Sequence, residues 1–185
     1  MKLENIIVKL RQLKNSDIDM LVVYLNKEEV TKHITAAIPQ PYTKDDAQWW
    51  VDNAKNSPHI MAIEIDSKFV GCISAQIGDF EYSCGAEIGY WIGKEFWNQG
   101  VTTEAVRLFT ESLFTNTDLI RLFVSVVSLN IGSIRVLEKN GFSLEGILKK
   151  ASYKHGEYFD EHLFSKIKNQ KSKIKNQKSK IKNQK

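Results

Sequence analysis

The stretch GYWIGKEFWNQGVTTEA, residues 89–105, decides how this chain is interpreted. A strand-like segment ends near Ile92, a short loop follows, and apolar residues recur at helical spacing after Gly100. The first N–H groups of such a helix have no partner within it, and the helix dipole favours an anion beside them. Gly100 allows close approach of a phosphate, and Thr102 and Thr103 add hydroxyl donors. The segment therefore predicts a phosphate or pyrophosphate site, with a plain helix cap at Gly100 as the alternative.

Strand and helix patterns alternate on both sides of this segment. The expected strands are Ile6–Leu13, Ile60–Ile65, Phe69–Ile77, Gly85–Ile92, Arg121–Val127, Phe142–Lys154 and Tyr158–Ile167. The expected helices are Asp17–Asn26, Thr43–Asn56, Gly100–Phe114 and Ser133–Lys139. This order predicts an α/β fold with a mixed central sheet of about seven strands and flanking helices.

The composition is that of an ordinary globular domain, with 185 residues, 42% hydrophobic and 26% charged. Cys72 and Cys84 are too few for a disulfide scaffold, and neither they nor the histidines have a metal-ligand spacing. The first residues, MKLENIIVKLRQL, lack the apolar core of a signal peptide, and no apolar run approaches the roughly 20 residues that span a bilayer. We therefore expect a cytoplasmic protein that has no metal and does not associate with a membrane.

Charge is distributed unevenly along the chain. Its end repeats SKIKNQK three times, at 165–171, 172–178 and 179–185. These copies carry nine of the 26 basic residues and no acid, so residues 1–164 hold 17 basic and 22 acidic side chains, a net charge of −5. An acidic body disfavours a nucleic-acid interface and suits either a cationic substrate, such as an amine, or simple solubility. We expect a folded domain over 1–167 and a solvated basic low-complexity tail over 168–185; binding of this tail to RNA, an acidic membrane or an acidic partner is the alternative.

Four segments, in this order, resemble the GNAT superfamily of N-acetyltransferases, and specifically its Rim-type branch of ribosomal-protein N-terminal acetyltransferases. They are AEIGYWIGKEFWNQGVTTEA at 86–105, the strand at 121–127, NIGSIRVLEKNGF at 130–142 and EGILKKASYKHGEYFD at 145–160. The similarity covers about residues 6–167. The loop departs from the superfamily pattern at Trp97, usually Gln or Arg, and at Thr102, usually Gly or Ala. Trp at the first of these positions is common in the Rim-type branch.

The resemblance implies the GNAT fold, with acetyl-CoA as co-substrate in the splay between two central strands. The main-chain groups of Tyr90, Trp91 and Ile92 would receive the pantetheine arm. Asn130 would bond the cofactor near its amide arm, with Ser133 close by, and Asn130 is at the same time a candidate helix N-cap. The pyrophosphate would be held by the loop and helix start, which comprise Trp97, Asn98, Gln99, Gly100, Val101, Thr102 and Thr103.

The resemblance also implies direct attack of an amine on the thioester in a ternary complex, without a metal. Glu87 is the preferred base, acting through water, and a cross-sheet ion pair is the equally weighted alternative for it. Ser133 is the candidate acid for the departing thiolate, because Leu137 occupies the position where many members carry a tyrosine; Tyr153 is a weaker candidate. Rim-type enzymes often place an acid near Ser152, and this chain does not.

The acceptor is constrained by the chemistry of amines. An α-amino group, with a pKa of about 7.7–8.0, is roughly a tenth neutral at pH 7, whereas a lysine, at about 10.4, is neutral on the order of 0.1% of the time or less. A peptide N-terminus therefore demands less from a base. We expect a protein or peptide N-terminal amine as acceptor. The alternatives are a polyamine or another small-molecule amine, or a catalytically weak acyl-CoA-binding module. The oligomeric state is left open, a homodimer included.

Overall fold

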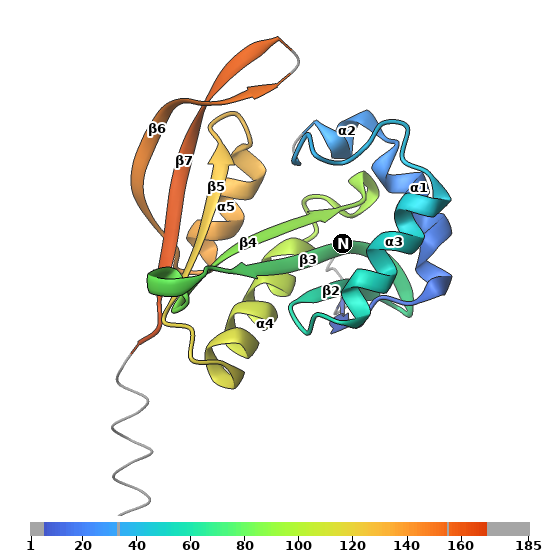
Figure 1. Cartoon of the computed structure of the whole chain (residues 1–185), viewed down its shortest axis with the longest axis horizontal. Coiled ribbons are helices and arrows are strands. Elements are labelled where there is room, and N and C mark those ends of the chain that lie inside the picture. The colour runs from blue at the N-terminus through green and yellow to red at the C-terminus, as the bar shows by residue number, and fades with distance from the viewer. Residues whose placement is uncertain (1–5, 33, 155, 170–185) are drawn as a thin grey trace, which may run out of the picture.

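A computed structural model describes residues 6–32, 34–154 and 156–169 of the chain. Its centre is a seven-stranded mixed sheet of order β1-β2-β3-β4-β5-β7-β6 (Figure 1). The strands are β1 (Val8–Arg11), β2 (Ile60–Ile65), β3 (Lys68–Ile77), β4 (Gly85–Ile92), β5 (Arg121–Val127), β6 (Ser143–Lys154) and β7 (Glu157–Ile167). The α-helices are α1 (Ile18–Leu25), α2 (Glu28–Thr31), α3 (Lys44–Lys55), α4 (Val101–Asn116) and α5 (Ile131–Lys139). Neighbouring strands pair antiparallel, except β4 and β5, which are parallel.

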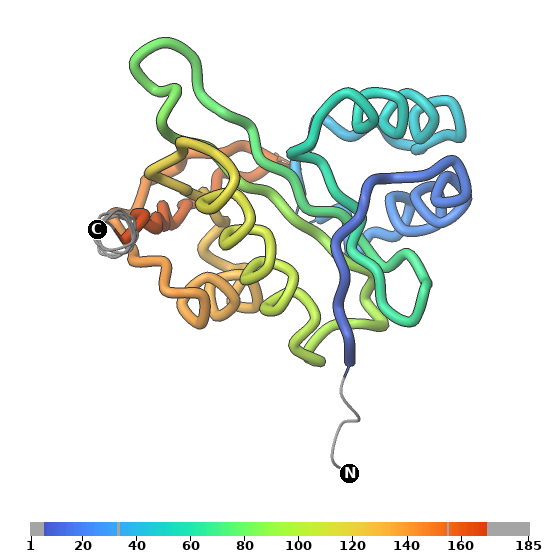
Figure 2. The backbone as a smooth tube through the Cα atoms, turned by 90° about the horizontal axis from the view of Figure 1, so that it is seen from below, coloured from blue at the N-terminus to red at the C-terminus, as the bar shows by residue number. Residues whose placement is uncertain are grey.

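Helices cover both faces of the sheet. Helices α4 and α5 pack on one face, and α1 and α3 pack on the other (Figure 2). The core on the α4 face includes Phe109 and Leu137, and the core on the opposite face includes Leu21 and Val51, all at most 1% exposed. Burying a side chain of this size stabilises the fold by about 1.5–3 kcal/mol. The α/β class and the mixed sheet expected from the sequence are confirmed.

The elements match the expected ones, with small differences at their ends. Strand β1 is shorter than expected, and the single helical turn α2 was not expected, because four residues are too few to show helical periodicity. The first SKIKNQK copy continues β7 as far as Ile167, with Ser165 only 5% exposed. The other two copies, 172–185, lie outside the described residues.

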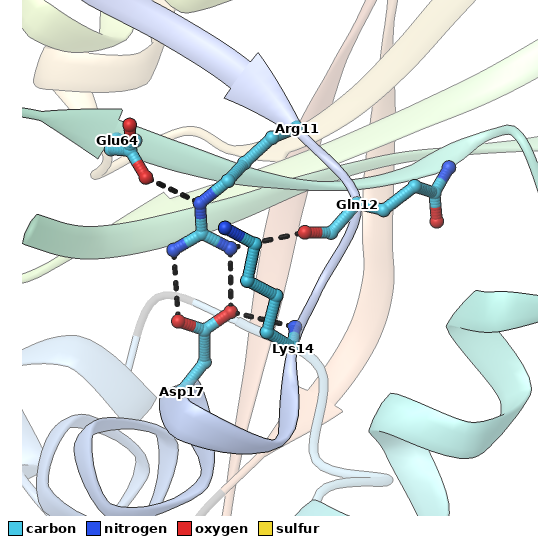
Figure 3. A network of polar contacts seen from close by, with 5 residues as sticks. All are labelled: Arg11, Gln12, Lys14, Asp17 and Glu64. Carbon is cyan, nitrogen blue, oxygen red and sulfur yellow. Dashed lines mark hydrogen bonds and ion pairs between the residues drawn. The ribbon is translucent and has the colours of Figure 1, made fainter. Parts of the chain in front are cut away.

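Arg11, at the end of β1, joins the sheet to the start of α1. Its guanidinium donates two hydrogen bonds to the Asp17 carboxylate, at 2.7 and 2.8 Å, and one to Glu64 on β2 (Figure 3). Asp17 is 3% exposed and also accepts from the main-chain N–H of Lys14 at 2.9 Å. A carboxylate this buried requires such partners, and the paired bonds fix where the first helix leaves the sheet.

Candidate functional site

Strands β4 and β5 pair only where they begin. Gly85–Glu87 pair with Arg121–Phe123, whereas β4 runs on to Ile92 and β5 to Val127 without further pairing between the two in the described part of the chain. The strands diverge visibly beyond this point (Figure 1). The splay implied by the resemblance is therefore present, and it exposes main-chain groups along one edge of β4.

The main-chain groups of Tyr90 and Ile92 face this gap, whereas those of Trp91 face β3. The direction follows from Gly93, whose N–H donates to the Val70 carbonyl of β3 at 2.9 Å. Successive residues of a strand alternate in the edge toward which they bond, so odd-numbered residues here face β3 and even-numbered ones face β5. Of the three residues expected to offer main-chain groups to a pantetheine arm, two are oriented to do so.

A cavity of about 470 Å³ opens beside the gap. This volume falls in the range of small-molecule sites, roughly 300–1,000 Å³. All the expected cofactor residues except Gln99 line it, namely Tyr90, Trp91, Ile92, Trp97, Asn98, Gly100, Val101, Thr102, Thr103, Asn130 and Ser133. The structure thus brings together residues from β4, the loop after it, and the starts of α4 and α5.

The start of α4 forms an anion nest at one end of the cavity. Gly100 is its N-cap, in the left-handed conformation with φ of 79°, and a Cβ there would meet nothing within 4 Å. The first main-chain bond of the helix runs from the Glu104 N–H to the Gly100 carbonyl, so the N–H groups of residues 101–103 have no partner within the helix. Thr102, where relatives carry a smaller residue, lines the cavity as well.

Two side chains of the loop before α4 donate hydrogen bonds to main-chain carbonyls. The Trp97 indole donates through Nε1 to the Ile92 carbonyl at 3.1 Å, which leaves the N–H of Ile92 as its group facing the gap. The Gln99 amide donates through Nε2 to the Glu95 carbonyl at 2.7 Å, and Gln99 does not line the cavity. Asn98 takes a left-handed φ of 59°, which its short polar side chain tolerates. The side chain of Gln99 is therefore engaged within the loop, and the contact of Gln99 with the pyrophosphate stays a prediction.

A hydrogen-bonded group of three residues, Tyr90, Asn130 and Ser133, also lines the cavity. Asn130 caps α5, its Oδ1 accepting from the Ser133 N–H at 3.1 Å. The Ser133 hydroxyl lies 2.7 Å from the Tyr90 hydroxyl, which reaches it from β4. Burial raises the pKa of Tyr90 to about 12, so the phenol is protonated at neutral pH. We expected only main-chain contacts from Tyr90, and no spacing in the sequence relates these two hydroxyls.

The other positions considered for the acid do not line the cavity. Leu137, where the resemblance implies a tyrosine in many superfamily members, is fully buried in the core beneath α4. Tyr153 is 63% exposed and packs on Tyr158, with ring centroids 4.9 Å apart. The Ser152 hydroxyl is buried and has no hydrogen-bond partner within the described residues. Ser133 is thus the candidate whose hydroxyl lies at the cavity.

Glu87 lies where β4 leaves β5, at the last paired position, opposite Phe123. Its neighbours Ala86 and Ile88 belong to the core beneath α4, so Glu87 lies on the opposite face of the sheet. It is exposed and does not line the cavity. No cross-sheet ion pair to Glu87 occurs within residues 6–32, 34–154 and 156–169. The expected base and acid therefore lie on different sides of β4.

Two cations on α5 line the cavity and were not predicted. Arg135 and Lys139 lie one turn apart, and both are exposed. In the part of the chain that the structure describes, neither forms an ion pair. Their charges add to the field of the α4 nest and favour a ligand that carries several phosphates.

Lys154 ties the β6–β7 hairpin to the segment between α2 and α3. Its ammonium donates to the main-chain carbonyls of Thr31, Lys32 and Ile34, at 2.8, 3.1 and 2.6 Å. Burial lowers the pKa of Lys154. Because Val30 and Ile34 line the cavity, this clamp fixes one side of its mouth.

The remaining candidates are accounted for as follows. Cys72 is buried, and burial raises the pKa of its thiol, whereas Cys84 is exposed; both are free. Cys72 belongs to the core on the face of α1 and α3. Among the described residues, no cluster of three or more His, Cys, Asp or Glu side chains is arranged to hold a metal ion. None of the helices in those residues is long and apolar enough to cross a bilayer.

Comparison with known proteins identifies the family. Residues 8–143 match the family described as acetyltransferase (GNAT) domain. An uncharacterized N-acetyltransferase of Bacillus licheniformis is 30% identical over 167 residues, which are 87% of this chain and 93% of the relative. The ribosomal-protein-serine acetyltransferase of Escherichia coli (strain K12) is 33% identical over 82 residues, 44% of this chain and 46% of that protein. RimJ of Mycobacterium smegmatis, in complex with CoA-disulfide, shares the fold with a TM-score of 0.76 at 22% identity, covering 86% of this chain and 81% of that one.

The residues at the cavity fit the donor that this family uses. The unpartnered N–H groups of residues 101–103 suit a pyrophosphate, and the gap beside Tyr90 and Ile92 suits an amide-bearing arm. The matched segment runs from β1 to the start of β6 and so contains every residue of the cavity. The chain therefore belongs to the GNAT family of acetyltransferases, and acetyl-CoA is its acetyl donor.

Proposed function

We propose that this N-acetyltransferase acts on the α-amino group of a protein or peptide N-terminus. The observation that carries the proposal is the position of Glu87, an exposed carboxylate at the point where β4 leaves β5. An amine that enters from the face of α1 and α3 meets this carboxylate on one side of β4 and the donor cavity on the other. The name of the Escherichia coli relative, a ribosomal-protein-serine acetyltransferase, supports the choice of acceptor.

Each group of site residues has a role in this proposal. The start of α4 holds the pyrophosphate, assisted by Arg135 and Lys139, and main-chain groups of Tyr90 and Ile92 receive the pantetheine arm. Glu87 takes the proton from the attacking amine through a water molecule. Ser133 donates to the departing sulfur. Because an α-amine is already about a tenth neutral at pH 7, it demands less from its proton acceptor than a lysine does.

The domain limits and the location complete the proposal. Residues 1–167 form the catalytic domain, and 168–185 form a basic tail outside the reaction. Two free cysteines without a disulfide suit a reducing compartment such as the cytoplasm.

The acceptor can be tested with the full-length chain, acetyl-CoA and a panel of amines, by following thiol release. We expect turnover with short peptides that begin with free serine or alanine. We expect none with the same peptides carrying a blocked N-terminus and an internal lysine. Turnover confined to spermidine, an aminoglycoside or the blocked peptides would contradict the N-terminal acceptor. Binding of acetyl-CoA without turnover of any amine would favour the acyl-CoA-binding module instead.

The role of Glu87 makes a separate prediction. Replacing Glu87 by Gln removes the base, so kcat should fall by about a hundredfold. The KM for acetyl-CoA should stay unchanged, because Glu87 does not line the cavity. Steady-state kinetics measure both quantities. Glu81→Gln, an exposed glutamate in the β3–β4 connection, is the matched control and should keep the wild-type kcat; equal losses in the two variants would exclude Glu87 as base.

The Lys154 clamp is expected to act on the binding of acetyl-CoA. Lys154→Met removes the donor shared by three carbonyls, so the segment that bears Val30 and Ile34 should loosen. We expect the KM for acetyl-CoA to rise about tenfold, equivalent to about 1.4 kcal/mol, and amide hydrogen exchange in residues 28–32 to quicken. Lys150→Met, an exposed lysine of the same hairpin, is the control. Unchanged exchange in Lys154→Met would show that the clamp does not hold the segment.

A further inference from the structure

We propose that Tyr90 is a positioning residue that aims the hydroxyl proton of Ser133 at the departing sulfur of acetyl-CoA. The inference rests on the function proposed above for its place in the reaction. The Tyr90 hydroxyl lies 2.7 Å from Ser133 Oγ, and both residues line the cavity. Tyr90 reaches Ser133 from β4, so the contact joins β4 to α5.

Counting the protons of the Tyr90 and Ser133 hydroxyls shows which proton remains available to the sulfur of acetyl-CoA. Each hydroxyl has one proton and can accept through its oxygen. A phenol is a better donor than an aliphatic alcohol, so Tyr90 donates to Ser133 Oγ. The second contact of the phenol, 3.5 Å from the Ser133 carbonyl, is too long to compete. Ser133, whose N–H is already bonded to Asn130, then directs its own hydroxyl proton away from Tyr90 and into the cavity.

The Tyr90 ring packs against the core beneath α4, so its hydroxyl is held in place. An accepted hydrogen bond also polarises the Ser133 hydroxyl and makes it a stronger donor. Ser133 lies in the first turn of α5, where the helix dipole favours a negative charge. All three effects stabilise charge that develops on sulfur in the transition state and is absent in the ground state.

The pKa values of a thiol and of Tyr90 show that the phenol does not transfer its proton to the sulfur. The thiol of cysteine has a pKa of about 8.5, whereas burial raises the pKa of Tyr90 to about 12. Because the phenol is the weaker acid, transfer of its proton to a thiolate is unfavourable. Tyr90 therefore keeps its proton, and Ser133 holds the thiolate by a hydrogen bond. As the N–C bond forms, the C–S bond breaks and its electron pair goes to sulfur, while the amine proton leaves through water toward Glu87.

The Tyr90–Ser133 pair also takes the role of a tyrosine that this chain lacks at the position of Leu137. The resemblance implies a tyrosine in many superfamily members where this chain has Leu137, and Leu137 is fully buried and does not line the cavity. Here a phenol from β4 acts through a serine on α5 instead. Tyr90 and Ser133 line the same cavity as the start of α4.

The first experiment needs no acceptor. CoA bound to the wild-type chain is titrated through the ultraviolet absorbance of its thiolate. We expect the bound thiol to have a pKa below that of free CoA titrated in the same way, and Tyr90→Phe and Ser133→Ala each to return it toward the value of free CoA. Ser133→Thr, which keeps a hydroxyl, should retain the lowered value. An unchanged thiol pKa in Tyr90→Phe would overturn the proposal, whatever amine the enzyme acetylates.

The second experiment uses kinetics with an amine that the panel identifies. Tyr90→Phe and Ser133→Ala should each lower kcat by about tenfold to a hundredfold, with little change in the KM for acetyl-CoA. The double variant should lose no more than the worse single variant, because both act through one hydrogen bond. Losses that multiply would show that Tyr90 acts independently of Ser133. Tyr158→Phe, a tyrosine 67% exposed, is the control. Absence of turnover with every amine would count against the proposed function, and the thiol titration would still decide the role of Tyr90.

Discussion

Replacing Gly100 by Asp is expected to abolish binding of acetyl-CoA, whereas Asn at the same position should weaken it only moderately. Both residues tolerate the left-handed φ of 79° found here, and a Cβ meets nothing within 4 Å. The two variants therefore share shape and backbone strain and differ in one negative charge beside the anion nest. Unit charges about 4 Å apart interact by about 4 kcal/mol at an effective dielectric constant of about 20.

We accordingly expect the Kd for CoA, measured by calorimetry, to rise by about a hundredfold or more in Gly100→Asp. Gly141→Asn supplies the control for strain. Gly141 also has a left-handed φ, 75°, with nothing near its Cβ position, but it does not line the cavity. This variant should bind CoA normally. If Asp and Asn at Gly100 gave the same Kd, the start of α4 would not be the phosphate site.

Loss of the Asp17 carboxylate should cause the largest loss of stability. In Asp17→Asn, the Arg11 guanidinium faces a neutral amide in place of the carboxylate that accepts two of its hydrogen bonds (Figure 3). Breaking a buried ion pair costs about 3–5 kcal/mol, and because the Arg11 side chain is 18% exposed we expect the lower end, about 3 kcal/mol. Urea denaturation followed by circular dichroism measures this free energy of unfolding.

Asp19→Asn is the matched control, two residues further along the chain. Asp19 pairs with Lys44 at 2.7 Å, but the two side chains are 76% and 73% exposed. An exposed pair contributes about 0.2–1 kcal/mol, so this variant should be nearly as stable as the wild type. Equal destabilisation by the two changes would mean that burial does not set the strength of the Arg11–Asp17 pair.

Local signals predicted much of the fold and of the donor site. The start of α3 could be read from the residue types at Thr43 and Asp46, and the Asp46 N–H donates to Thr43 Oγ1 at 3.2 Å. Likewise Gly100 and Asn130 begin helices as expected, since the residue type and its position relative to the apolar pattern carry the information. The face on which Glu87 lies follows from strand alternation alone.

Contacts between distant segments could not be predicted in this way. The Tyr90–Ser133 contact joins residues 43 positions apart, and the bond from Lys154 to Thr31 joins residues 123 apart. Whether such side chains meet depends on how strands and helices pack, and no periodicity encodes it. Gln99 shows the same limit at short range, because its side chain turns to the Glu95 carbonyl rather than toward the cavity.

The parallel pairing of β4 with β5 has an evolutionary consequence. A parallel pair needs a crossover, and here that crossover is α4 with the loop before it. The donor site is thereby built largely from one continuous stretch of chain. The face of the sheet that bears Glu87 is bordered by α1, α3 and the β6–β7 hairpin, which precede or follow that stretch. Insertions and substitutions in α1 and α3, which contribute no residue to the cavity, can alter the choice of amine without altering the grip on acetyl-CoA. A descendant of this chain could thus acquire a new acceptor while inheriting its donor unchanged.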